Sequence, residues 1–223
     1  MWLFDPLYLI MLLPALALGI YAQWRVQSTF AQYSRVNASS GTTAERLARR
    51  LLDGAGLGNV KIEQVKGTLT DHYDPRTRTL RLSNPESRSL AALGVAAHEV
   101  GHAIQHARAY RPLELRTAIV PMANFGSQLA LPLFFLGLFF QMPPLVTAGI
   151  VAYSLAVLFT LVTLPVEFNA SQRAIALLRD GGFVTSGQEL GAVKRVLGAA
   201  ALTYVAAAAT AVLTLLYLLS RRR

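Results

Sequence analysis

Four long apolar runs limit the folds that this 223-residue chain can adopt. They cover residues 5–24, 118–140, 145–165 and 198–219. Each is close to the length of about 20 residues that an α-helix needs to cross a bilayer. The chain is 53% hydrophobic and only 15% charged, which is the composition of a membrane protein. The sequence therefore predicts a mainly α integral membrane protein with about four transmembrane helices.

The apolar runs also predict an arrangement along the chain. No positive segment precedes the first run and no cleavage pattern follows it, so residues 1–24 are interpreted as a membrane anchor. Two prolines separate the second and third runs, which predicts a transmembrane hairpin over residues 118–165. Residues 198–223 would form a C-terminal hydrophobic helix with a basic tail. If that helix spans, the tail lies outside, against the positive-inside tendency.

Basic residues are concentrated in the polar segments between the runs, and the net charge is +9. Lys and Arg gather on the cytoplasmic side of membrane helices, which predicts a cytoplasmic location for the polar segments. No nucleic-acid-binding motif accompanies the charge, so we expect no nucleic-acid partner. The chain has no cysteine, so any zinc ion must be held by His, Asp or Glu.

The segment 25–117 has the composition of a small α+β domain. Its apolar residues recur with helical spacing in two places and alternate as in strands elsewhere. An Asp-Pro turn joins the last two predicted strands. The predicted elements are a helix over 42–52, strands over 60–65, 67–73 and 79–83, and a helix over about 87–107.

The last predicted helix carries His98-Glu99-Val100-Gly101-His102. Positions i and i+4 lie one above the other on a helix, so His98 and His102 can direct ring nitrogens at one metal ion. Glu99 projects beside them. A carboxylate at this place can act as general base for metal-activated water, as in the His-Glu-x-x-His metallopeptidases.

A catalytic zinc ion usually takes a third protein ligand, and the sequence restricts where it can come from. The metzincin continuation of the motif is excluded, because Gln105 and Arg108 occupy its glycine and histidine places. His106 follows on the same helical face, but it lies about 6 Å further along the axis than His102. One ion cannot easily reach both of these and His98.

Glu167 is the preferred third ligand. It follows the third apolar run, at the start of a predicted third-ligand helix and polar connection over residues 166–197. A carboxylate beside hydrocarbon is costly unless it is paired or binds a metal. The alternative is an interfacial carboxylate that is solvated or paired with Arg173.

Three stretches give the chain a specific resemblance. Residues 67–76 (GTLTDHYDPR), 96–105 (AAHEVGHAIQ) and 167–171 (EFNAS) resemble the YugP-like neutral zinc metallopeptidases of bacterial membranes. The resemblance implies a zincin-type core related to the HtpX-like gluzincin proteases, with His98, His102 and Glu167 as zinc ligands and Glu99 as base. HtpX-like proteins usually have Asp where this chain has Ser171, so a carboxylate that orients the histidines is not implied.

His72 and Tyr73 lie on a strand expected beside the motif helix. In zincins such a strand often borders the cleft, where a substrate can add as a further strand. Either side chain could contact the substrate or polarise the scissile carbonyl. The alternative is that both are ordinary hairpin residues.

The leading functional prediction is a membrane-embedded zinc endopeptidase that acts on membrane or membrane-proximal proteins. Its expected partners are protein or peptide substrates and the lipid bilayer of the bacterial plasma membrane, with the active site toward the cytoplasm. One alternative is a site-2-type intramembrane protease, which would take its third ligand from Asp180-Gly181. Another is a membrane scaffold with a purely structural zinc site.

Overall fold

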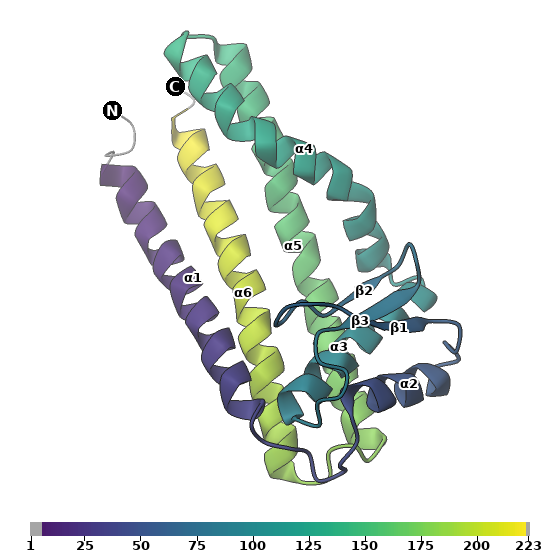
Figure 1. Ribbon diagram of the computed structural model, residues 1–223. Coiled ribbons are helices and arrows are strands. Elements are labelled where there is room, and N and C mark those ends of the chain that lie inside the picture. The colour runs from purple at the N-terminus through teal and green to yellow at the C-terminus, as the bar shows by residue number, and fades with distance from the viewer. Residues whose placement is uncertain (1–5, 222–223) are drawn as a thin grey trace. The chain divides into compact units, whose positions relative to one another are not determined.

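The computed structural model describes residues 6–221. The chain divides into two compact units. The helical unit consists of residues 1–23, 114–165 and 202–223, and the mixed unit consists of residues 24–113 and 166–201. The elements, labelled in Figure 1, are α1 (Pro6–Tyr33), α2 (Ala44–Gly54), β1 (Lys61–Gln64), β2 (His72–Asp74), β3 (Thr79–Leu82), α3 (Leu90–Ala107), α4 (Arg111–Phe139), α5 (Pro143–Asp180) and α6 (Gly187–Ser220).

The mixed unit contains a three-stranded sheet in the order β1-β3-β2. The central strand β3 pairs in parallel with β1 and antiparallel with β2, and Leu80 lies opposite both Ile62 and Tyr73. Figure 1 shows β3 between its two neighbours. One edge of β2 therefore pairs with β3. Among the described residues, no strand pairs with its other edge.

The second predicted strand is much shorter than the sequence suggested. We predicted residues 67–73, but β2 covers only His72–Asp74. Gly67 has φ +115° and Leu69 has φ +58°, and neither value is compatible with an extended strand. The predicted strands at 60–65 and 79–83 are present as β1 and β3.

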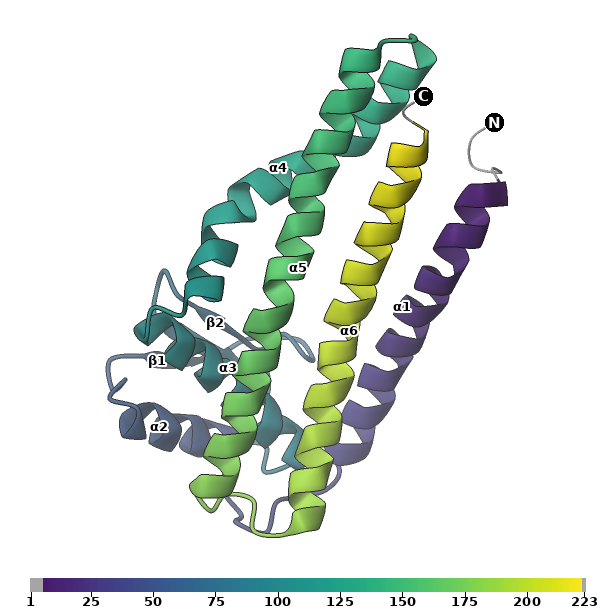
Figure 2. The same ribbon diagram turned by 180° about the vertical axis from the view of Figure 1, so that it is seen from behind.

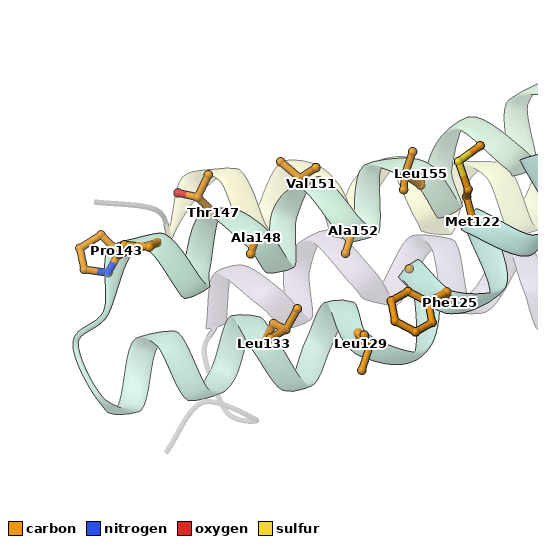
Figure 3. Close-up of a pocket in the computed structure, with 12 residues that line it drawn as sticks. Met122, Phe125, Leu129, Leu133, Pro143, Thr147, Ala148, Val151, Ala152 and Leu155 are labelled. Atoms are coloured by element: carbon orange, nitrogen blue, oxygen red, sulfur yellow. The ribbon is translucent and has the colours of Figure 1, made fainter.

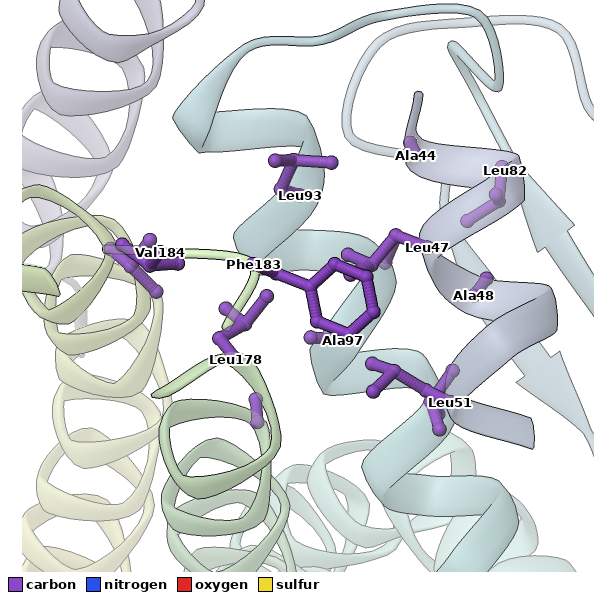
Figure 4. Packing of buried hydrophobic residues seen from close by; sticks show 14 of the residues in the cluster. Ala44, Leu47, Ala48, Leu51, Leu82, Leu93, Ala97, Leu178, Phe183 and Val184 are labelled. Carbon is purple, nitrogen blue, oxygen red and sulfur yellow. The ribbon is translucent and has the colours of Figure 1, made fainter. Parts of the chain in front are cut away.

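Two helices pack together to form most of the core of the mixed unit. The N-terminus of α2 is capped by Thr43, and that of α3 is capped by Ser89, whose hydroxyl accepts the Ala92 N–H at 3.2 Å. Leu47 and Leu51 of α2 lie in one buried cluster with residues of α3, and Figure 4 shows the Phe183 ring between these helices and Leu178. Burying a leucine side chain contributes roughly 1.5–3 kcal/mol. The core thus holds α3, and with it the motif, in place.

In the helical unit, α4 and the first part of α5 form a hairpin. Glycines allow the two backbones to approach closely: a Cβ at Gly126 would lie 2.6 Å from the Ala152 oxygen, and one at Gly149 would lie 2.6 Å from the Phe134 nitrogen. An apolar groove of about 800 Å³ runs between the helices (Figure 3). Its lining includes Met122, Phe125 and Leu129 of α4 and Ala148, Val151 and Ala152 of α5.

One predicted helix boundary is wrong. We expected the third apolar run to end at Pro165 and a new helix to begin near Glu167, but α5 includes both residues. Figure 2 shows α5 as one uninterrupted helix. Proline fixes φ near its helical value and removes only one N–H, so a long membrane helix can tolerate it. Similarly, α6 includes the fourth apolar run and the polar residues before it in one helix.

Three helices of the described residues, α4, α5 and α6, are long and apolar enough to cross a membrane. The C-terminal run is among them. The predicted N-terminal span begins in residues 1–5, which lie outside the described part of the chain, and it is not among the three. The chain is thus mostly helical with a small mixed sheet, and the fourth span remains a prediction.

Candidate metal centre

Helix α3 places the two motif histidines on one face. His98 and His102 are one turn apart, and their ring centroids are 4.7 Å apart with the ring planes at 88°. Both side chains are largely buried, with 14% and 12% of their surface exposed. The two rings are thus held edge to face in a nearly dry environment, where a ligand pair keeps a fixed geometry.

Helix α5 brings Glu167 to the same point. Its Oε2 atom lies 3.2 Å from His98 Nε2 and 3.6 Å from His102 Nε2, and its side chain is only 4% exposed. Ligand atoms about 2.0–2.2 Å from a tetrahedral zinc ion lie about 3.3–3.6 Å from one another. The distances of 3.2 and 3.6 Å from Glu167 Oε2 to the two imidazoles are close to that range. The two imidazoles and the carboxylate therefore fit a zinc ion both in chemistry and in spacing.

Glu99 is a second carboxylate in this region. Its ligand atoms lie within 4.8 Å of those of His98 and His102, so it competes with Glu167 for the third place on a metal. However, Glu99 Oε2 accepts a hydrogen bond from the Tyr73 backbone N–H at 2.9 Å. Glu167 Oε2, by contrast, contacts both imidazoles directly. We therefore regard Glu167 as the better ligand and Glu99 as a neighbour of the metal position.

The surroundings of Glu99 favour a proton-accepting role. Only 8% of the residue is exposed, and this burial raises the pKa of its carboxyl, although the nearby His102 and His98 act in the opposite direction. A raised pKa brings a carboxylate closer to the range in which a general base can both take up and release a proton near neutral pH.

Tyr73 and His72 point in different directions because successive side chains of a strand face opposite sides. The Tyr73 hydroxyl lies 2.9 Å from His106 Nδ1, one turn beyond His102. Burial raises the pKa of Tyr73, so the phenol keeps its proton at neutral pH. His72 contacts the Thr70 carbonyl and Arg81 instead. Of these two residues, only Tyr73 contacts the candidate centre, through its backbone N–H to Glu99, and the predicted substrate contacts stay predictions.

Asp180, the third ligand of the site-2-type alternative, does not reach the centre. It lies on the same helix as Glu167 but 13 residues further on, which corresponds to about 20 Å along the axis. Its carboxylate is exposed and accepts a hydrogen bond from Arg179 Nε at 2.8 Å. This position argues against the site-2-type ligand set.

Two residues beside the histidines were not predicted. The Nδ1 atom of His98 lies 3.1 Å from the Ser171 hydroxyl, and the Nδ1 atom of His102 lies 3.0 Å from Gln105 Oε1. Gln105 follows His102 by three residues on the same helix, and this spacing is a signal that could have revealed the contact. Ser171 was noted only as a departure from the aspartate of related proteins.

Comparison with known proteins shows the family to which the chain belongs. Residues 8–223 match the model of a family described as "Putative neutral zinc metallopeptidase". The chain is 50% identical over 212 residues to "Putative membrane protease YugP" of Bacillus subtilis (strain 168), covering 94% of each chain. No solved structure is significantly similar. The chain therefore belongs to this family of neutral zinc metallopeptidases, as the resemblance of its three motif stretches led us to expect.

Proposed function

We propose that this protein is a membrane-embedded zinc endopeptidase that cleaves membrane or membrane-proximal proteins. The observation that carries the proposal is the meeting of His98 Nε2, His102 Nε2 and Glu167 Oε2 beside the buried Glu99. The family and the membrane-protease name of the relative support it. The basic polar segments favour an active site toward the cytoplasm.

His98, His102 and Glu167 would hold the zinc ion. When bound, zinc supplies Lewis-acid activation of water and of the scissile carbonyl. The two imidazoles are neutral ligands and Glu167 brings one negative charge. These ligands would therefore only partly neutralise Zn²⁺, and the centre would keep a net positive charge. That charge favours the negative oxygen that develops during peptide hydrolysis.

Glu99 would accept the proton of the attacking water and later pass it to the leaving nitrogen. The Tyr73 N–H donates to Glu99 Oε2, which orients the carboxylate. Burial makes the carboxyl easier to protonate in the intermediate state, because desolvation penalises its charged form. Both features are what a reversible proton carrier requires.

Tyr73 would serve as a donor to the developing oxyanion. Its phenol is protonated and is held by His106 at 2.9 Å. The free edge of β2 faces the same region, since the Tyr73 N–H points away from β3 and toward Glu99. An extended peptide could pair along this edge with its scissile bond near the ligands.

The proposal is tested with purified full-length protein in lipid vesicles and an unstructured peptide. We expect cleavage that stops when a chelator removes zinc and returns when zinc is added. Glu99→Gln should retain zinc but lose at least about 100-fold in kcat, as is typical when a general base is removed. Glu45→Gln is the matched control, because Glu45 is an exposed carboxylate on α2.

Two outcomes would overturn the proposal. Normal turnover by Glu99→Gln would exclude this residue as the base. Persistent inactivity of the wild-type protein at full zinc occupancy, across varied peptides, would favour the scaffold alternative.

A further inference from the structure

Gln105 is a polar side chain that is completely buried, with 0% of the residue exposed. Its Nε2 atom lies 2.8 Å from the Val166 carbonyl oxygen and 3.0 Å from Asn169 Oδ1, and its Oε1 atom lies 3.0 Å from His102 Nδ1. Buried polar atoms need such partners. Here every partner belongs to a candidate ligand or to the helix that carries Glu167.

The direction of these hydrogen bonds can be worked out from their outer end. Arg173 Nε can only donate, and it lies 2.7 Å from Asn169 Oδ1, which is therefore an acceptor. The Val166 carbonyl is also only an acceptor. Both atoms face the same end of the Gln105 amide, so that end must be its NH₂ group.

The opposite end of the Gln105 amide is then an oxygen, which can only accept. His102 Nδ1 must therefore carry a proton in order to donate to it at 3.0 Å. In the neutral ring this leaves the lone pair on Nε2, the atom that faces Glu167 Oε2 at 3.6 Å. We propose that Gln105, oriented by Asn169 and Arg173, is a positioning residue that fixes the metal-binding tautomer of His102.

The two histidines differ in this respect. His98 Nδ1 faces the Ser171 hydroxyl, which can either donate or accept and so imposes no tautomer. Only His102 is bound to an amide whose polarity is set elsewhere. The inference rests on the proposed zinc site, but it concerns the metal-free ring and can be tested without cleavage.

The direct test is a histidine ring ¹⁵N spectrum of the metal-free wild-type protein, at a pH where His102 is neutral. We expect the Nδ1–H tautomer for His102. Gln105→Met, which keeps the side-chain volume but removes the acceptor, should give a mixture of tautomers. Zinc affinity, measured by competition with a chromophoric chelator, should then fall roughly 10–100-fold.

Arg173→Met is the second variant, because it leaves Gln105 in place and removes only the outer donor. We expect a smaller loss of zinc affinity and partial tautomer mixing, since the Val166 carbonyl still accepts from Gln105. The matched control is Arg179→Met, an exposed arginine on the same helix that pairs with Asp180. It should change neither reading.

An Nε2–H tautomer in the metal-free wild-type protein would overturn the inference, even if Gln105→Met fails to fold. An unchanged tautomer and zinc affinity in a folded Gln105→Met would overturn it as well. A wild-type protein that binds no zinc would instead defeat the proposed function, and the tautomer of the metal-free ring would still decide the role of Gln105.

Discussion

Gly101 of α3 lies directly against the backbone of Ala170 on α5. A Cβ atom at position 101 would be 2.8 Å from the Ala170 carbonyl oxygen and 3.2 Å from its Cα. The neighbouring atoms are backbone, which cannot rotate away. The glycine between the two motif histidines therefore permits the helix spacing that brings Glu167 to them.

Gly101→Ala should push the two helices apart. We expect destabilisation of about 1–3 kcal/mol from overpacking, less the gain of about 1 kcal/mol from the higher helix propensity of alanine. Zinc affinity should fall at the same time, because Glu167 moves away from the imidazoles. Denaturant unfolding and chelator competition measure the two effects.

Gly198→Ala is the control for this substitution. Gly198 also lies within a helix, α6, but a Cβ there would meet nothing within 4 Å. The control should gain up to about 1 kcal/mol. A Gly101→Ala protein with equal or greater stability and unchanged zinc affinity would contradict the packing argument.

Glu167→Ala and Asp180→Ala should differ in zinc content. Glu167 contacts both imidazoles, whereas Asp180 pairs with Arg179 at the exposed end of α5. We expect Glu167→Ala to purify with little zinc and Asp180→Ala to keep a full equivalent, as measured by atomic emission. The reverse result would restore the site-2-type ligand set.

Zinc binding should strengthen as the pH rises through the neutral range. Burial disfavours the charged form of His102, but the Glu167 carboxylate, 3.6 Å from its Nε2 atom, and the charge of Glu99 outweigh this and raise the pKa of His102. A proton must therefore leave the ring before zinc binds. Calorimetry in buffers of different ionisation enthalpy should detect proton release that declines once the pH exceeds this raised pKa.

The stability of the metal-free protein should show the opposite trend. A group whose pKa is raised on folding adds stability that is fully present below its unfolded pKa of about 6.5 and is lost as the pH rises through the folded value. Unfolding with zinc chelated should show this loss. A metal-free protein that becomes more stable over that range would contradict the assigned direction.

Tyr73→Phe should reduce kcat with little change in KM, because the hydroxyl would act on the developing oxyanion and not on the bound substrate. Removing one such donor typically costs about 100-fold or more. Tyr110→Phe, at the residue just before α4, is the control and should leave kcat unchanged. A raised KM with an unchanged kcat would contradict this role and indicate a contact in substrate binding only.

Local spacing was sufficient to predict that the two motif histidines and the candidate base lie together on one helix. Their relation depends only on the period of one helix, and the strands β1 and β3 likewise follow from the alternation of apolar and polar residues within each segment. The sequence signal for Glu167 was different, since it came from the cost of placing a carboxylate beside an apolar run. The structure brings it to within hydrogen-bonding distance of His98 Nε2.

Other features could not be predicted because they depend on distant parts of the chain or on backbone angles. The partners of Gln105 are 61 and 64 residues away and become visible only when α5 lies beside α3. The strand at 67–71 failed because Gly67 and Leu69 have positive φ angles. Pro165 seemed to end a helix that in fact accommodates it.

The discontinuous make-up of the mixed unit has a consequence for biosynthesis. Its first segment ends at residue 113 and its second begins at residue 166. A chain emerging from the ribosome thus presents His98 and His102 well before Glu167 exists. On the proposed ligand set, a nascent chain cannot retain zinc tightly until the helical hairpin has been translated. On the proposed function, the order of synthesis would keep the centre inert until the hairpin of α4 and α5 has been made.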